Sequence, residues 1–104
     1  MKVNVEGIEI DGTHLQGEFS HSFQEIKSVF GDPILGESGD KVQAEWAIQF
    51  DDGTVATIYD WKEWGTSYEN VKNWHVGGYN RKAFDAVKSM LARTGSLCEG
   101  GLSE

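Results

Sequence analysis

The chain has 104 residues, of which 38% are hydrophobic and 12% aromatic, a composition that excludes a disordered protein and suits one domain with one core. The net charge of −8 is uneven, because residues 1–60 carry 12 of the 17 acidic residues but only 3 of the 9 basic ones. Direct nucleic-acid binding through phosphates is therefore not expected, and the acidity suits a solubilising surface or an acidic decoy for a basic partner.

The N-terminal segment MKVNVEGIEIDG alternates polar and apolar residues, which predicts one or two short strands at a sheet edge and a turn at Asp11-Gly12. It lacks the apolar run of a signal peptide, and no stretch approaches the roughly 20 apolar residues that span a bilayer. The single Cys98 cannot form an internal disulfide. We therefore expect a cytoplasmic protein that does not bind membranes.

A short helix is predicted from Phe23 to Phe30. Ser22 and Glu25 have the spacing of a capping box, in which each side chain accepts a hydrogen bond from the other residue's backbone amide. Gly31, with Pro33 just beyond it, ends the helix. The glycine-containing segment at residues 34–41, ILGESGDK, is expected to be a mobile loop.

Residues 42–61 predict a β-hairpin that turns at residues 51–53 and forms the centre of the sheet. Its first strand alternates, with the core face made of Val42, Ala44, Trp46, Ile48 and Phe50. A two-residue turn at Asp52-Gly53 would bring Tyr59 and Trp61 to that face, and burial favours this register. A three-residue turn with Gly53 in the left-handed conformation would send both to the opposite face, where they would form a contact surface.

The C-terminal half predicts one helical turn that starts near Thr66 or Ser67, a short strand at 74–76, a break at 77–79 and a helix over 81–93 that Gly95 ends. Residues 96–104 are expected to form a flexible tail. The predicted fold is a single α+β domain over residues 1–95. It consists of a small antiparallel sheet built on the central hairpin, with one short and one longer helix packed on one face.

No catalytic motif such as HExxH, GxSxG or CxxC occurs, and the three histidines are scattered along the chain. Asp60 and His75 make the only credible acid/base pair, and we expect a hydrogen bond between them to fix the sheet edge instead of catalysis. We therefore expect a binding protein that is not an enzyme and needs no cofactor or metal.

Two features between residues 59 and 81 predict a binding site. Six aromatic residues lie between positions 59 and 79, more than one strand and a turn can bury, so some are expected to stack on a ligand. A glycine pair leads from a strand into a helix whose N-terminus can hold an anion. The candidate ligand-binding residues are Trp61, Trp64, Trp74, His75, Gly77, Gly78, Asn80, Arg81 and Lys82.

The strings GTVATIYDWKEWG at 53–65 and NWHVGGYN at 73–80 resemble a group of small phage-encoded proteins without an assigned activity. The similarity runs from SFQEIKSVFGDP in the first helix through the second helix. It implies an accessory protein made in an infected bacterial cytoplasm, where such proteins commonly act stoichiometrically.

Two modes of action are therefore expected. The favoured one is sequestration of a nucleotide-type signal molecule of the host defence. The alternative is an acidic inhibitor that blocks a host defence protein, as a nucleic-acid mimic for example. A homo-oligomer is also expected, since small domains with surplus aromatic residues often bury them in a symmetric dimer.

Overall fold

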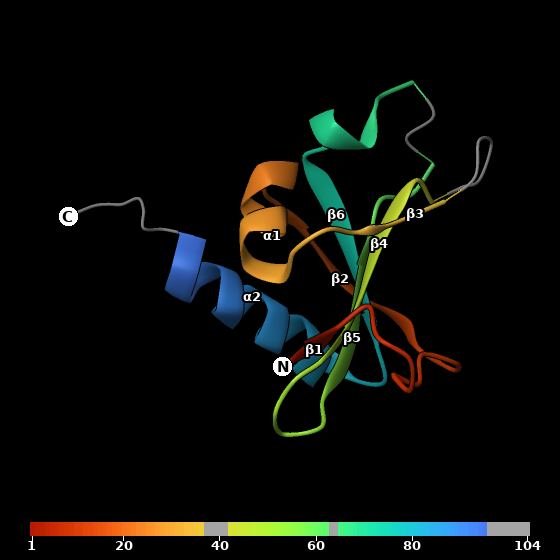
Figure 1. The fold of residues 1–104 in the computed structure, drawn as a ribbon, viewed down its shortest axis with the longest axis vertical. Coiled ribbons are helices and arrows are strands. Elements are labelled where there is room, and N and C mark those ends of the chain that lie inside the picture. The colour runs from red at the N-terminus through yellow and green to blue at the C-terminus, as the bar shows by residue number, and fades with distance from the viewer. Residues whose placement is uncertain (37–41, 63–64, 96–104) are drawn as a thin grey trace.

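The computed structural model describes residues 1–36, 42–62 and 65–95 of the chain. Within these ranges, six strands form one antiparallel sheet in the order β1-β4-β5-β6-β2, with β3 also paired to β4 (Figure 1). The strands are β1 (Lys2–Val3), β2 (His14–Ser20), β3 (Ile34–Leu35), β4 (Ala44–Gln49), β5 (Val55–Tyr59) and β6 (Asn73–Gly78). The helices are α1 (Phe23–Phe30) and α2 (Arg81–Gly95), with a 3₁₀ turn at Tyr68–Asn70. The α+β class is confirmed.

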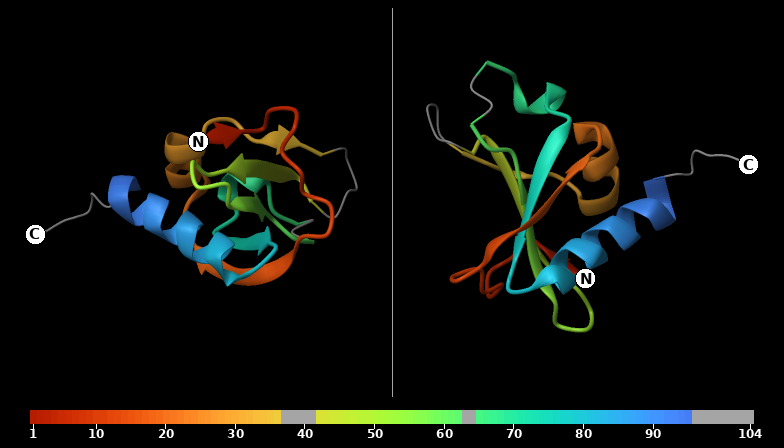
Figure 2. Two further views of the ribbon diagram at one scale, coloured as in Figure 1. Left: turned by 90° about the horizontal axis from the view of Figure 1, so that it is seen from below. Right: turned by 180° about the vertical axis from the view of Figure 1, so that it is seen from behind.

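Both helices lie on the same face of the sheet, as the view from behind in Figure 2 shows. This is the core face, and its centre is aromatic. Trp46 of β4 and Trp74 of β6 are fully buried, with their ring centroids 5.4 Å apart, and Phe23 of α1 packs 5.8 Å from Trp46. None of the helices in the described part of the chain has the length and apolarity needed to cross a membrane.

The predicted start and end of α1 and the predicted start of α2 are confirmed, whereas α2 extends to Gly95, two residues beyond the predicted 93. The Ser22 hydroxyl accepts a hydrogen bond from the Glu25 amide, and the Glu25 carboxylate accepts one from the Ser22 amide. That second bond lowers the pKa of Glu25 below its usual value. Gly31 ends α1 with a φ of 85°, and the Asn80 side chain caps α2 by accepting from the Lys82 amide at 2.9 Å.

The hairpin between β4 and β5 has a three-residue turn, so the register favoured from burial is wrong. Trp46 pairs with Ile58 and Glu45 with Tyr59. Gly53 has a φ of 92°, in the left-handed region that glycine tolerates best. Ala56 and Ile58 therefore belong to the core face, and Tyr59 points to the opposite one.

Three further expectations need correction. Residues 14–20 form the long edge strand β2, which was not predicted, and Ile34–Leu35 is a strand at the opposite edge instead of a loop. Gly77 and Gly78 continue β6 where a break was expected. The loop at 37–41 and the tail at 96–104 lie outside the described residues, whereas β1 does lie at the sheet edge as predicted.

Candidate functional site

The face of the sheet opposite the helices, here called the outer face, has a row of small side chains across three strands. Ala47 pairs with Thr57, and Thr57 pairs with Gly77. The adjacent row is larger, because Glu45 pairs with Tyr59, Tyr59 with His75, and His75 with Glu18. Since residues two apart along a strand share a face, the small row forms a depression beside the large one.

This depression is an open hollow of about 210 Å³, which we call the trough. Thr57 and Gly77 contribute to its floor, while the N-terminal arm contributes Ile10 and β2 contributes Leu15. Trp61 is 41% exposed and Leu15 is 52% exposed, so apolar surface remains accessible around the hollow. The trough is lined by Ile10, Thr13, His14, Leu15, Val42, Glu45, Thr57, Tyr59, Trp61 and Gly77.

The trough has an acidic character. Burial raises the pKa of Glu45, and burial together with the charges of Glu45 and Glu18 raises the pKa of Tyr59. Neither lysine nor arginine is among the described residues that line it. His75 stacks on Tyr59 with 5.5 Å between ring centroids, and its Nε2 lies 3.7 Å from a Glu18 carboxylate oxygen.

The raised pKa of Glu45 predicts a pH dependence of stability. Between the ordinary glutamate pKa of 4.5 and the higher folded-state pKa, the folded protein binds more protons than the unfolded chain, so stability falls as pH rises through this window. We expect Glu45→Gln to remove this fall. Urea midpoints measured from pH 4 to pH 7 should therefore rise for the variant relative to the wild type as pH increases. Parallel pH profiles for the two proteins would contradict the prediction.

The N-terminal arm is hydrogen-bonded to the rest of the domain at two places. The Tyr79 hydroxyl lies 2.8 Å from the carbonyl oxygens of Glu9 and Asp11, to which it can donate. Further back, the Asn4 side chain accepts from the Ala47 amide at 2.8 Å. These bonds hold residues 4–11 beside β4 and β6. The exposed Tyr79 therefore has a structural role, which is to anchor the N-terminal arm.

The residues of the predicted anion site at the start of α2 are engaged in packing and ion pairs. A Cβ atom on Gly78 would lie 2.3 Å from the Cβ of Ala83, and one on Gly77 would lie 2.6 Å from the Thr57 hydroxyl oxygen. Close packing therefore accounts for both glycines. The Lys82 ammonium lies 3.2 Å from an Asp52 carboxylate oxygen, and the Arg81 guanidinium lies 3.7 Å from Asp85. Both cations are thus already next to carboxylates.

The predicted aromatic residues are not brought together with that helix start. Trp74 is fully buried in the core, so the expectation that it stacks on a ligand is wrong, and Trp64 lies outside the described residues. Trp61 does line the trough. It follows Tyr59, which pairs with His75, whereas Gly78 faces Ala56 five residues earlier. At about 3.3 Å per residue, some 17 Å of strand separates Trp61 from the level of the helix start.

The expected bond between Asp60 and His75 is also absent. The Asp60 carboxylate is fully buried and accepts hydrogen bonds from the backbone amides of Gln43 and Ala44, at 2.7 and 3.0 Å. It holds the start of β4 instead of forming an acid/base pair, while His75 belongs to the outer face. No group of three or more His, Cys, Asp or Glu residues in the described part of the chain is placed to hold a metal ion.

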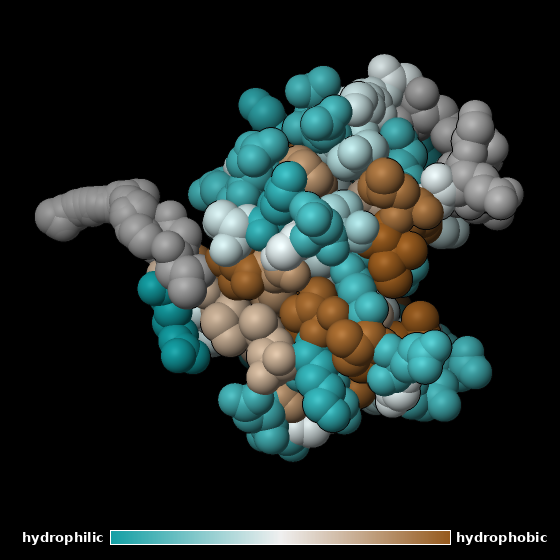
Figure 3. Space-filling view, in the orientation of Figure 1, coloured by the Kyte–Doolittle hydropathy of each residue, from teal (hydrophilic) through white to brown (hydrophobic). Residues whose placement is uncertain are grey.

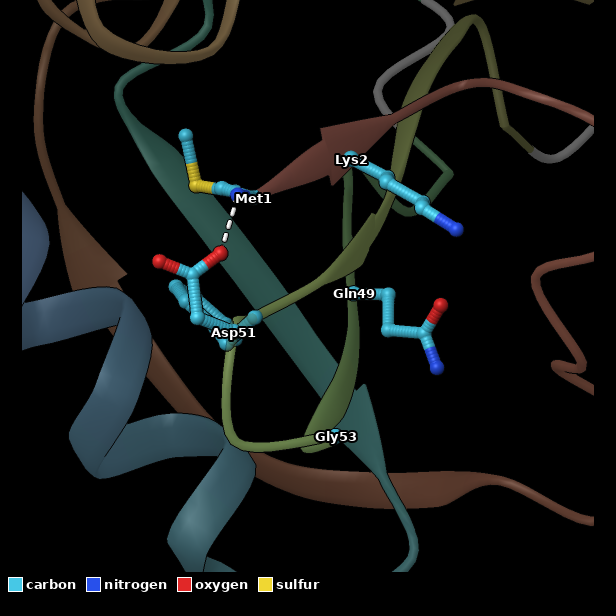
Figure 4. Close-up of a pocket in the computed structure, with 6 residues that line it drawn as sticks. Met1, Lys2, Gln49, Asp51 and Gly53 are labelled. Carbon is cyan, nitrogen blue, oxygen red and sulfur yellow. Dashed lines mark hydrogen bonds and ion pairs between the residues drawn. The ribbon is translucent and has the colours of Figure 1, made fainter.

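Two other surfaces are less suited to be sites. A hollow between β1 and the turn of the hairpin contains the Met1 ammonium and the Asp51 carboxylate, which pair with each other, while Lys2 and Gln49 point away from that pair (Figure 4). Hydrophobic side chains also gather over β1 and β3 (Figure 3), where Ile34 and Leu35 are exposed. Exposed apolar residues alone are common on protein surfaces, so we assign no function to this patch.

Glu45, Thr57, Ile10 and Leu15 are site residues that the sequence did not reveal. The only feature of the sequence that pointed to Glu45 was strand alternation, which placed it on the solvent side of β4. Leu15 and Thr57 come together through strand pairings distant in sequence, because both pair with Gly77. Ile10 belongs to the N-terminal arm between β1 and β2. The chain matches no family model, and no curated protein or solved structure is significantly similar to it.

Proposed function

We propose that this protein acts by stoichiometric binding, and that it docks on a basic surface of a partner protein through the outer face of its sheet. The trough is the observation that carries this proposal. It combines exposed apolar side chains, such as Trp61 and Leu15, with the half-buried carboxyl group of Glu45. Exposed aromatic anchors within a charged rim are typical of protein interfaces.

The size of the trough supports a protein partner over a whole nucleotide. Its volume of about 210 Å³ lies below the roughly 300 to 1,000 Å³ of most small-molecule sites, and suits one inserted side chain. Its carboxylate would also repel a phosphate group. Together with the resemblance to phage-encoded proteins, this favours the inhibitor mode: an accessory protein that blocks a host defence protein in the bacterial cytoplasm.

Sequestration of a nucleotide-type signal is the second candidate, and one contact favours it. The Lys62 ammonium lies 5.7 Å from the centre of the Trp61 ring. A base stacked on Trp61 would place its phosphate within reach of a cation at this position. In this mode the ligand would sit at the rim of the trough, away from Glu45.

Native mass spectrometry after affinity capture from a bacterial lysate separates the two candidates. We expect a host polypeptide to be retained by the wild type and by Leu35→Ala, and to be released from Trp61→Ala because the interface loses its aromatic anchor. A hot-spot tryptophan contributes about 2 kcal/mol or more, which corresponds to roughly 30-fold in affinity.

The Leu35→Ala variant is the matched control, since it truncates an exposed apolar residue of β3 that does not line the trough and that pairs with Ala44 of the core face. Retention of a compound of a few hundred daltons in place of a polypeptide would favour sequestration. Recovery of the bare chain from every preparation would contradict both candidates. Capture that is equal for wild type and Trp61→Ala would show that the partner binds elsewhere.

A further inference from the structure

The floor of the trough holds a buried hydroxyl group that points into it. Thr57 is only 3% exposed, and its hydroxyl oxygen lies 2.6 Å from where a Cβ on Gly77 would be, above the small row of the outer face. Its side chain forms no hydrogen bond with any other described residue. A buried polar atom without a partner costs free energy unless a ligand or water satisfies it.

The neighbouring groups determine which chemistry would satisfy this hydroxyl. Glu45 is on the strand next to Thr57, one pair of residues along, so the two side chains are diagonal neighbours on one face. Glu45 forms no ion pair with any described residue. The carboxylate accepts only, and the hydroxyl can accept as well. The trough therefore presents hydrogen-bond acceptors and negative charge to its occupant.

The aromatic and apolar walls add a shape requirement. The rings of Tyr59 and Trp61 meet edge to face, with centroids 6.4 Å apart and an angle of 77° between their planes. A flat cation can stack on such rings, while Leu15 and Ile10 offer contact to a chain of methylene groups. Guanidinium is planar, weakly hydrated and carries only donors, whereas an ammonium group is compact and strongly hydrated.

We propose that the trough receives an arginine side chain of the partner protein, with its guanidinium group between Glu45 and Thr57 and against the ring of Tyr59. The inference rests on the proposed function, since it names the group by which the basic partner is recognised. The uneven charge of the chain agrees with it, because 12 acidic residues lie in positions 1–60 and would attract a basic surface.

The test is an NMR titration of the full-length ¹⁵N-labelled protein with N-acetyl-arginine amide. Its citrulline analogue, which has the same shape without the charge, and N-acetyl-lysine amide are titrated in parallel. We expect saturable shifts at the backbone amides of Thr57 and Gly77 and at the Trp61 indole. Loss of a charge-assisted hydrogen bond corresponds to about 10-fold weaker binding, which we expect for citrulline.

Two substitutions localise the contact. Glu45→Gln and Thr57→Val keep the side-chain shape, and each is expected to weaken arginine amide binding by about 5-fold through loss of one hydrogen bond. Glu69→Gln is the matched control. It removes the same charge from an exposed residue outside the trough, so binding should change by less than about 2-fold because exposed charges are screened.

Several results would overturn the assignment. Equal binding of citrulline would exclude a charge requirement, and equal binding of lysine amide would identify a general cation site. If Glu45→Gln and Glu69→Gln weaken arginine amide binding equally, the effect arises from the net charge of the protein and not from a contact with Glu45. If the arginine probe fails while a partner is still released by Trp61→Ala, the arginine assignment is wrong and the proposed docking function stands. If the Trp61→Ala variant still retains the partner, the proposed docking function is wrong.

Discussion

Replacing Trp46 by alanine is expected to lower the free energy of unfolding by about 4 kcal/mol, the middle of the range for truncating large buried aromatic side chains. Trp46 is fully buried, and its ring packs against Trp74 and Phe23. Its indole nitrogen also donates to the carbonyl oxygen of Gly31 at 2.8 Å, at the end of α1. The variant therefore loses core volume and a bond between sheet and helix.

Urea unfolding followed by far-ultraviolet circular dichroism measures this loss. Domains of this size are stable by roughly 5 to 15 kcal/mol, so a large part of the total would disappear. Trp61→Ala is the control at an exposed tryptophan, and we expect it to cost less than about 1 kcal/mol. Similar midpoints for the two variants would mean that Trp46 does not occupy the centre of the core.

The elements predicted from sequence are those whose signals are local. The capping box of Ser22 and Glu25 and the cap at Asn80 each involve residues two or three positions apart, so they act in whatever tertiary context the helix has. The alternation of β4 likewise depends on one strand alone. In each case the local pattern and the packed structure agree.

The hairpin register was mispredicted because two physical effects point in different directions. Counting buried aromatics favoured the two-residue turn, but the turn residues themselves stabilise the longer one. The Asp52 carboxylate accepts from the Thr54 amide at 2.9 Å, and this bond, with a smaller effect of Lys82, lowers the pKa of Asp52 to about 2. Local turn chemistry therefore decided the face of Tyr59.

The trough was beyond prediction because its residues meet only through non-local pairing. Leu15, Thr57 and Gly77 come from β2, β5 and β6, and β2 has a bulge between Leu15 and Gly17 that blurs its alternation. The anion site was predicted from a glycine pair that occurs in many strand-to-helix turns. Gly78 of that pair is instead required by the close approach of α2 to β6. This approach depends on tertiary packing, which a local stretch of sequence does not reveal.

That approach gives the second large prediction: Gly78→Ala is expected to destabilise the protein by about 2 kcal/mol. The added methyl would lie 2.3 Å from the Cβ of Ala83, which has no rotatable bond to move away. Overpacking typically costs about 1 to 3 kcal/mol, and reduced freedom of the unfolded chain returns about 0.4 to 1 kcal/mol. The Tm should fall by about 10 °C for a domain of this size.

Two further variants make the test specific. Gly65→Ala is the matched control, because a Cβ at that position would have no atom within 4 Å, and its Tm should be unchanged or slightly higher. Ala83→Gly removes the atom that the new methyl strikes, at a cost of about 1 kcal/mol in helix propensity. If the two methyl groups do collide, the double variant will be more stable than the sum of the single effects requires. If the effects of the two substitutions are strictly additive, the stability lost in Gly78→Ala arises in the backbone of β6. In that case α2 is free to shift away from the sheet.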